Sequence, residues 1–299
     1  MPAVSRADII IRLKDAFIEE FKDRATISAN FTVDKAHPRP NTAKKDGDLH
    51  VAGRAPEIKL PIVAELMNAK SVKPAINLIH AAEDNGQPLR MVGAWRIWCE
   101  HGGDSQQIQG RELRPFTSTN PDHVFEIHPI TQLGNGMDVS KTLKPITGFR
   151  TKDAHDAFTS YESKKCKITP NADGTTTIRT TMGGYNYVEF VMEILDEQPE
   201  TQPPDGRFVF ASVMTLGKET IVQKRRMVFV DGTPPVQAVS RLGPGDQLHV
   251  LGLPRISLKL VSWRKDVHKH PERHPEWKDE DVLNWDLPYE MIIVGAYRR

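Results

Sequence analysis

Acidic and histidine side chains recur at every second residue in two short stretches of the chain. Asp46, Asp48 and His50 lie at i, i+2 and i+4, and Glu126 and His128 have the same spacing. On an extended strand, residues two apart share one face. Carboxylates and imidazoles that converge can bind a divalent metal ion, which can activate water for phosphodiester hydrolysis. These residues are therefore weak candidates for the metal ligands of a phosphodiesterase or nuclease.

The same residues also suit a structural role. Histidine–carboxylate pairs satisfy polar atoms that would otherwise be buried without partners, and they can fix the register of neighbouring strands. A nuclease also needs cations near the phosphate, and nothing in the sequence connects Arg54 or Arg96 to these residues. Because no recognised metal-ligand spacing occurs, the structural interpretation is favoured and no cofactor is expected.

A second group of residues, between positions 263 and 285, suits nucleic-acid binding. The segment reads WRKDVHKHPERHPEWKDEDVLNW, with basic residues between its tryptophans. Aromatic rings stack on bases, and basic side chains attract the backbone of a single strand. The expected contacts are stacking by Trp263, Trp277 and Trp285 and phosphate binding by Arg264 and Lys265. The alternative is a solvated loop whose tryptophans fold back on the core, which the acidic residues 279–281 favour.

A basic run at positions 224–226 lies in a predicted strand. Lys224 and Arg226 then face one way and Arg225 the other. A basic stripe across a barrel suits a nucleic-acid backbone. Charged residues that protect an exposed strand edge are an equal alternative. We include Lys224 and Arg226 among the candidate phosphate contacts.

The elements that must position these residues are predicted to be mainly β-strands. In the first half, the hydrophobic period of two predicts strands, and one stretch has helical spacing. The expected strands are 27–33, 48–54, 60–69, 89–101 and 124–132, with a helix at 72–82. Three strands, a helix and two strands is the order of the oligonucleotide/oligosaccharide-binding (OB) barrel.

The second half repeats this order. The expected strands are 187–195, 207–216, 221–230, 247–253 (continuing through 256–263) and 289–296, with a short helix at 234–242. A connector with a helix at 151–164 and a β-ribbon that turns at 171–174 precedes it. We therefore predict two OB-fold-like barrels in tandem, with boundaries at 1–144, 145–186 and 187–299.

The N-terminus is predicted to form an amphipathic helix. Ser5 and Asp8 resemble a capping box. Apolar residues then recur at helical spacing, namely Ile9, Ile10, Leu13, Ala16, Phe17 and Phe21. Docking on the first barrel is favoured over binding to a partner protein.

The composition bounds the compartment and the partners. The chain is 38% hydrophobic and 26% charged, without an apolar run long enough to span a membrane or a recognisable targeting signal. Its two cysteines, Cys99 and Cys166, do not form a CxxC pair, so a cytoplasmic location is expected. Residues 1–144 contain 19 basic and 18 acidic side chains, and residues 145–299 contain 21 of each. Any nucleic-acid contact must therefore depend on local patches.

The first half also resembles a known group of proteins. The motifs DGDLH at 46–50, EHGG at 100–103 and FEIHP at 125–129 are similar to those of a family of small uncharacterised bacterial barrels. The resemblance covers roughly residues 27–133. It implies an OB-like barrel fold and no established activity. The chain differs from that family because it lacks a signal for export and has a second half.

These observations favour a non-enzymatic binding protein, with single-stranded DNA or RNA as the ligand. The phosphate-binding, dinucleotide, nucleophile-elbow and zinc-protease motifs are all absent from the sequence. Two alternatives stay open. One is a metal-dependent phosphodiesterase centred on the Asp/His/Glu residues, and the other is a scaffold that binds a protein partner.

Overall fold

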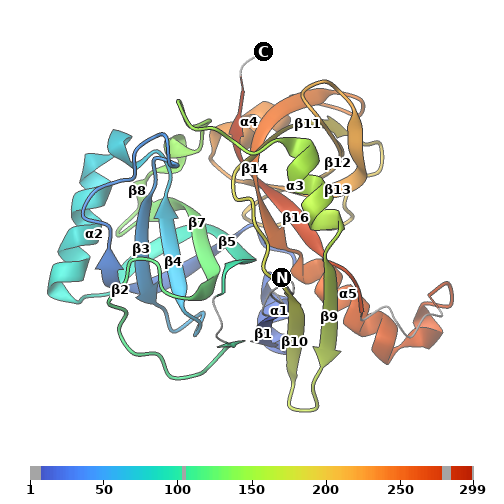
Figure 1. Ribbon diagram of the computed structural model, residues 1–299, viewed down its shortest axis with the longest axis horizontal. Helices are drawn as coiled ribbons and strands as arrows, with labels where there is room; N and C mark the ends of the chain where they lie inside the picture. Colours follow the sequence, from blue (N-terminus) through green and yellow to red (C-terminus); the bar gives the residue numbers. More distant parts are fainter. Residues whose placement is uncertain (1–7, 103–105, 278–283, 298–299) are drawn as a thin grey trace, which may run out of the picture.

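The computed structural model describes residues 8–102, 106–277 and 284–297. Two closed five-stranded barrels lie side by side, with few helices around them (Figure 1). The prediction of a mainly β chain with two barrels is therefore confirmed. None of the described helices is long and apolar enough to cross a membrane.

The first barrel is built from five strands with one helix inserted after the third. Its strands are β2 (Thr26–Ala36), β3 (Leu49–Arg54), β4 (Ile62–Leu66), β5 (Leu89–His101) and β7 (His123–Leu133), and its helix is α2 (Lys73–Asn85). The strands pair in the circular order β2-β3-β4-β7-β5. Only β4 and β7 are parallel, with Ile62 opposite Phe125, and the other pairs in the ring are antiparallel. The two-residue strand β8 (Met137–Asp138) pairs antiparallel with the end of β7.

The second barrel has the same connectivity. Its strands are β11 (Val188–Ile194), β12 (Gly206–Met214), β13 (Thr220–Val230), β14 (Gln247–Ile256) and β16 (Tyr289–Ala296), and its inserted helix is α4 (Pro234–Val239). The ring runs β11-β12-β13-β16-β14, and β13 and β16 are its parallel pair. The third and fifth strands therefore close both barrels.

Alternating hydrophobic residues explain these strands. In β11, Val188, Phe190, Met192 and Ile194 are buried and the residues between them are half-exposed. Each predicted barrel strand and the helix at α2 are present with shifted ends. Short connections complete the chain, namely the helix α3 (Ala154–Glu162) and the 3₁₀ turns η1 (Ala69–Ser71), η2 (Ser140–Thr142) and η3 (Pro271–Arg273).

The N-terminal amphipathic helix is not found as predicted. Residues Asp8–Lys14 form strand β1, and helix α1 covers only Asp15–Phe21. Ile9, Ile11 and Leu13 are buried and the intervening residues are not, which is a period of two. Three consecutive β-branched isoleucines favour an extended chain over a helix. The proposed cap at Ser5 lies outside the described residues.

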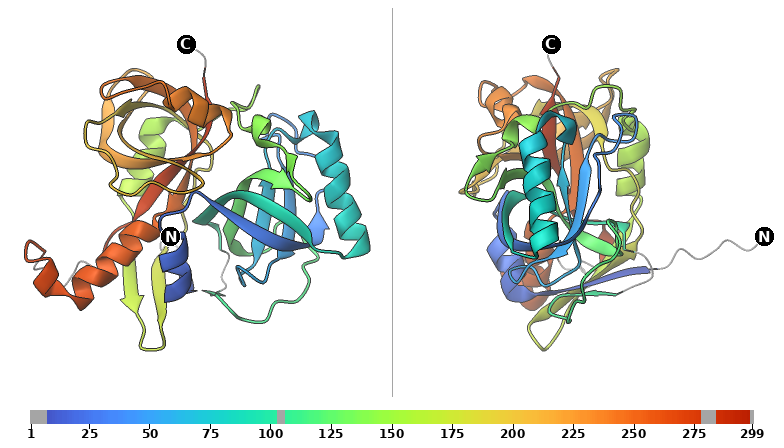
Figure 2. Two further views of the ribbon diagram at one scale, coloured as in Figure 1. Left: turned by 180° about the vertical axis from the view of Figure 1, so that it is seen from behind. Right: turned by 90° about the vertical axis from the view of Figure 1, so that its left-hand side faces the viewer.

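Strand β1 belongs to a third sheet, which joins distant parts of the chain. Its order is β15-β9-β10-β1-β6, in which β9 (Lys165–Pro170) and β10 (Thr175–Thr181) are the predicted ribbon. The edge strands are β6 (Gln107–Ile108) and β15 (Asn284–Asp286). Strand β1 pairs along its whole length with β10. Figure 2 shows the β9–β10 ribbon of this sheet beside α1, below the second barrel in the left-hand view.

The connection between β14 and β16 also differs from the prediction. Instead of a continued strand to residue 263, the chain forms helix α5 (Leu258–Lys269). Ser257 caps this helix, because its hydroxyl accepts a hydrogen bond from the Leu260 amide at 3.4 Å. Residues 263–269, predicted to lie in a loop, are therefore helical.

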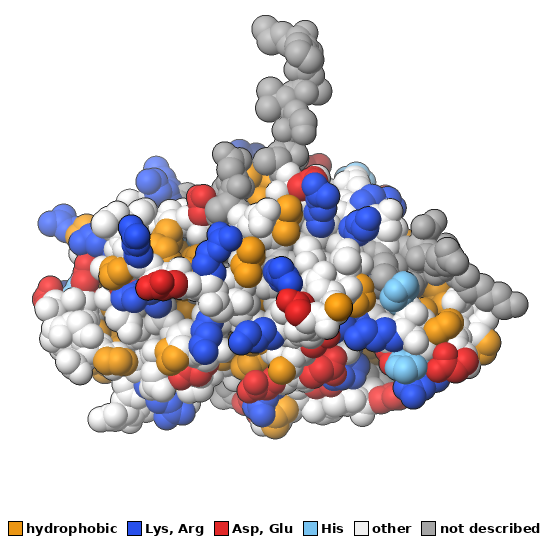
Figure 3. All heavy atoms as spheres, turned by 90° about the horizontal axis from the view of Figure 1, so that it is seen from below, with side chains coloured by type: hydrophobic (Ala, Val, Ile, Leu, Met, Phe, Trp, Pro, Cys, Tyr) orange, Lys and Arg blue, Asp and Glu red, His pale blue; other side chains and the backbone are white. Residues whose placement is uncertain are grey.

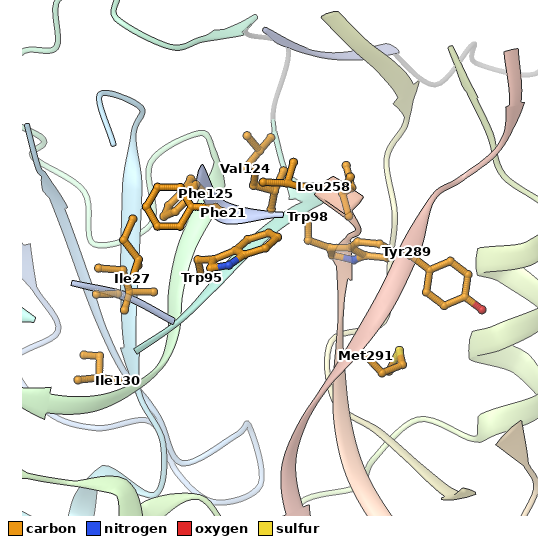
Figure 4. Close-up of a cluster of buried hydrophobic side chains, with 14 of the residues drawn as sticks. Phe21, Ile27, Trp95, Trp98, Val124, Phe125, Ile130, Leu258, Tyr289 and Met291 are labelled. Carbon is orange, nitrogen blue, oxygen red and sulfur yellow. The ribbon is translucent and has the colours of Figure 1, made fainter. Parts of the chain in front are cut away.

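The cores of the two barrels meet in one apolar cluster. Figure 4 shows Phe125 and Ile27 of the first barrel continuing through Trp95 and Trp98 toward Tyr289 of the second. A further apolar cluster of buried residues combines side chains of both barrels, among them Met67, Ala94, Phe208, Leu253 and Ile292. The barrels are thus packed face to face rather than joined by a free linker.

Candidate functional site

A hollow of about 490 Å³ opens on the outside of the second barrel. It lies over β12 and β13, between the loop that joins β11 to β12 and the start of α5. Its lining residues include Asp23, Glu197, Glu200, Phe210, Lys224, Arg225, Arg226, Ser257, Lys259 and Tyr289. Arg226, Ser257 and Tyr289 are buried and form the floor, whereas Glu197, Glu200 and Lys224 are exposed at the rim.

Three consecutive cations of β13 line the hollow, and each rests on an aromatic ring. The pairs are Lys224 on Phe210 at 4.4 Å, Arg225 on Tyr289 at 4.2 Å and Arg226 on Phe208 at 4.3 Å. A cation over a ring face is attracted by the quadrupole of the ring and is held in one orientation. These three cations are therefore held in position before any ligand binds.

Each of these cations also contacts a carboxylate. Lys224 pairs with Glu197, which belongs to the loop between β11 and β12. Arg225 pairs with Glu162 of α3 at 2.6 Å. The Lys224–Glu197 pair is solvent-exposed, so it contributes little to stability and can open at small cost.

The floor contains a buried arginine pair that shares one carboxylate. Arg226 and Arg255 both donate hydrogen bonds to Glu290, the latter at 2.6 Å. Burial lowers the pKa of Arg255 to about 10, and the charge of Arg226 acts in the same direction despite Glu290. Burial opposes ionisation of Glu290, but the two guanidinium groups hold its pKa below the usual value.

Arg255 also anchors the second barrel to the first. Its guanidinium lies 3.6 Å from the centroid of the Trp95 ring and donates hydrogen bonds to the carbonyl oxygens of Trp95 and Arg24, at 3.0 and 3.1 Å. Arg226 on the floor of the hollow is thus linked through Glu290 to Arg255 at the barrel interface.

The three predicted tryptophans come together beside α5, around Trp263 in the middle of that helix. Trp263 and Trp277 meet edge to face at 5.0 Å between ring centroids, and Trp277 and Trp285 meet at 5.3 Å. Trp285 is 37% exposed, and the other two are half-buried. The structure therefore provides one aromatic cluster in place of three separate stacking platforms.

Of the two basic residues beside Trp263, Arg264 stays with the cluster, its guanidinium 5.8 Å from the centroid of the Trp285 ring, whereas Lys265 points toward α1. Arg264 is buried and donates a hydrogen bond to the Asp286 carbonyl at 2.7 Å. Lys265 is buried and pairs with Asp15 of α1 at 2.7 Å. Both side chains hold α5 against the rest of the molecule.

A second hollow, of about 510 Å³, connects the first to the tryptophan cluster. It lies between α1 and α5, and Lys259 lines both hollows while Trp263 lines the second. Its other charged residues are Asp15, Glu19, Lys22, Lys265, Asp266 and Lys269. Seen from below, basic and acidic side chains alternate over the surface instead of forming one basic face (Figure 3). An anionic ligand on this surface would therefore contact separate cations rather than one continuous basic patch.

The predicted Asp/His/Glu group does converge, on the outside of the first barrel where the second barrel covers it. His128 Nε2 lies 3.7 Å from Asp48 Oδ2, and His128 Nδ1 lies 3.1 Å from Glu126 Oε2. His50 Nε2 lies 3.8 Å from Asp46 Oδ2. Asp48, Glu126 and His128 are almost completely buried. The spacing of two predicted that the residues of each strand would share a face, and the structure brings the two faces together.

Three members of this cluster were not identified from the sequence. Glu65 of β4 lies between the histidines, with its Oε2 3.4 Å from His50 and 3.5 Å from His128. Arg96 donates to Glu126 and to the Pro254 carbonyl of the second barrel. The Tyr187 hydroxyl donates to Asp48 and is 2.8 Å from His128 Nε2. Of these three residues, only Glu65 is marked in the sequence, because it is the single acidic residue in the apolar run of residues 60–69.

The electrostatics of the cluster favour protonated histidines. Burial opposes the charge on His128 and His50, but Glu65 and the neighbouring acids raise their pKa values to about 10 and about 9. Burial raises the pKa of Asp48 to about 6, although His128 opposes this. Cations from Arg96 and the histidines therefore offset the buried carboxylates without a metal ion.

The residue types of the cluster also suit a divalent metal. One ligand atom each from Asp48, Glu65 and His128 lies within 4.8 Å of the others. However, the Tyr187 hydroxyl is hydrogen-bonded to both Asp48 and His128, and thus occupies the space between them. A phosphodiester could reach these buried side chains only if the barrels separated. The arrangement fits a buried network of hydrogen bonds and ion pairs that joins the two barrels better than it fits a hydrolytic centre.

Comparison with known proteins gives no relative. No model of a known protein family matches the chain, and no curated protein is significantly similar to it. The function must therefore be argued from the site itself.

Proposed function

We propose that the protein is a non-enzymatic binding protein that takes single-stranded nucleic acid along its second barrel. Both barrels are proposed to be of the OB type, because each closes through its third and fifth strands. Barrels of this type bind oligonucleotides over the second and third strands and between the loops that follow the first and fourth strands. The hollow over β12 and β13 lies in that position, and this observation carries the proposal.

The proposed path extends from this hollow to the tryptophan cluster. Lys224, Arg225 and Lys259 would meet phosphates, and Trp285 would offer an exposed ring beside Arg264 of α5. Trp263, where the cluster begins, lies roughly 8 Å along the helix from its first residue. Arg264 and Lys265 would position α5 rather than contact the strand. The two free, buried cysteines support the proposal of a cytoplasmic location.

Fluorescence anisotropy with labelled single strands of about 12 nucleotides, at about 50 and 200 mM salt, tests this function. Wild-type protein should bind DNA or RNA strands more tightly at the lower salt. The Lys224→Gln/Lys259→Gln variant should weaken binding and make the logarithmic salt dependence shallower by about 1 per lysine. Lys44→Gln, an exposed change on the first barrel, is the matched control. Absence of binding at the lower salt would refute the proposal.

The same reactions examine the tryptophans and the hydrolytic alternative. Trp285→Ala should weaken binding by about 1–3 kcal/mol if the ring stacks on a base. Shortening of the strand in the presence of Mg²⁺ or Mn²⁺, abolished by EDTA, would instead favour the metal-dependent phosphodiesterase suggested by Asp48, Glu65 and His128. Intact strands under all these conditions agree with a binding protein.

A further inference from the structure

We infer that the hollow of the second barrel contains a subsite for a terminal phosphate, the phosphomonoester at one end of a nucleic-acid strand. This inference rests on the proposed function for its ligand class. It adds that the strand begins or ends in the hollow instead of passing through it. The subsite comprises Arg226 and Ser257 on the floor and Lys259 on the wall.

Arg226 presents unused hydrogen-bond donors to the hollow. Its Nε donates to Glu290, and its Nη2 contacts the Lys22 carbonyl at 3.2 Å and Ser257 Oγ at 3.5 Å. Its Nη1 makes no hydrogen bond with the residues that the structure describes, and the nearest carboxylate oxygen, of Asp23, is 3.9 Å away. Phe208 and Glu290 fix the guanidinium, so these donors are preorganised for an anion.

The charged groups around the floor of the hollow balance one another. Arg226, Arg255 and Lys259 share the carboxylates of Glu290 and Asp23, with Lys259 Nζ 3.1 Å from Asp23. Asp205 also interacts with Arg255, and the hydrogen bonds that it accepts from the amides of residues 25 and 26 leave its charge unchanged. Three cations therefore face three carboxylates, so an anion at Arg226 would bind through the free donors of Nη1 rather than through an excess of positive charge.

The start of α5 adds a second contribution from the same side. Ser257, Lys259 and Leu260, at the N-terminal end of this 12-residue helix, line the hollow. The N-terminus of a helix carries a partial positive charge and amides that point away from the helix, and it favours phosphate groups. The helix end and the Arg226 guanidinium thus converge on one space.

The rim explains why the phosphate would be terminal. Glu197 and Glu200 are exposed at the edge of the hollow, on the loop between β11 and β12. A nucleic-acid strand that crossed the hollow would place phosphodiester charges beside these carboxylates. A strand that ends in the hollow enters from one side only and need not pass them. A phosphomonoester also carries nearly two negative charges at neutral pH and three acceptor oxygens. It therefore gains more than a diester from the same cations.

The test compares three strands of identical sequence, with a 5′-phosphate, a 3′-phosphate or hydroxyl groups at both ends. One phosphorylated strand should bind about tenfold more tightly than the hydroxyl strand, which corresponds to about 1.4 kcal/mol. Lys259→Gln and Arg226→Lys should each bring the ratio toward one. Lys44→Gln should keep it. Because Arg226 is buried, circular dichroism must show that its variant is folded, and the exposed Lys259 provides an independent variant.

The outcomes separate this inference from the proposed function. Equal binding of all three strands overturns the terminal-phosphate subsite and leaves the proposed function intact. If no strand binds, the proposed function fails. Titration with a 5′-mononucleotide and with inorganic phosphate then shows whether the hollow binds a phosphate group. A perturbation of the Arg226 side-chain NMR signal by either compound, absent in Lys259→Gln, would keep it. No perturbation by millimolar phosphate would overturn it.

Discussion

The hydroxyl of Tyr187, on the second barrel, lies between Asp48 and His128 of the first. This contact joins two stretches that are 139 residues apart in the chain. The alternating spacing of Asp48 and His50 predicted which carboxylates and imidazoles would share a face, because parity along a strand is a local property. It gave no means of finding Tyr187, since nothing local to a tyrosine specifies a partner on another barrel.

The histidines of this cluster predict a loss of stability on the alkaline side. The pKa of His50 is raised from 6.5 to about 9, so its stabilising charge is fully present below pH 6.5 and is lost as pH rises through 9. We therefore expect the free energy of unfolding to fall between about pH 7 and 9. Urea titrations across this range measure it.

The control for this pH dependence is a histidine elsewhere. His50→Gln should make the slope of the profile shallower, with His128 supplying the remainder, whereas the exposed His155→Gln on α3 should leave it unchanged. An equal slope in wild type and His50→Gln would contradict the assignment.

At the scale of the element, Gly93 determines how closely β5 and β7 approach. A Cβ atom at this position would lie 2.4 Å from the Pro129 carbonyl oxygen and 2.7 Å from Ile127 Cγ2. Because the carbonyl belongs to the paired strand, Gly93→Ala must push the strands apart. We expect it to destabilise the protein by about 1–3 kcal/mol in urea unfolding. Gly184→Ala has open space at its Cβ and should be nearly neutral.

The elements themselves were predictable where one hydrophobic period dominated. The alternating residues of β11 fit only a strand, and α2 ends at Gly86 with a positive φ of 65°, as a glycine after a helix predicts. Errors occurred where the pattern was ambiguous. The apolar positions of β1 fit both periods, and the pairing with β10 decided between them. At α5, the apolar residues of β14 continue into the start of the helix, so the hydrophobic pattern does not mark where the strand ends.

At the scale of the whole molecule, the two barrels should unfold together. Buried ionic groups, Arg255 on Trp95 and Tyr187 on Asp48, cross the interface, and separating the barrels would leave them unpaired. Calorimetry should therefore show one transition in which the calorimetric and van't Hoff enthalpies agree.

A variant at the interface tests the same coupling. Tyr187→Phe should lower the stability of that single transition by about 1–3 kcal/mol, because Asp48 and His128 lose a buried partner. Tyr185→Phe, whose hydroxyl has no hydrogen bond among the described residues, is its control. Two separate transitions, with only one shifted by Tyr187→Phe, would show that the barrels are independent.

The third sheet also has a consequence for the order in which the protein can be assembled during synthesis. Strand β1 is made well before its long partner β10, which begins at Thr175, 161 residues after Lys14. A ribosome adds about 5–20 residues per second, so β1 waits roughly 8 to 32 s for that partner. Its three isoleucines, two of which are buried in the folded protein, lack this partner strand during that time. The newborn chain therefore depends on a chaperone, or on early burial of these isoleucines against the first barrel, more than the finished fold suggests.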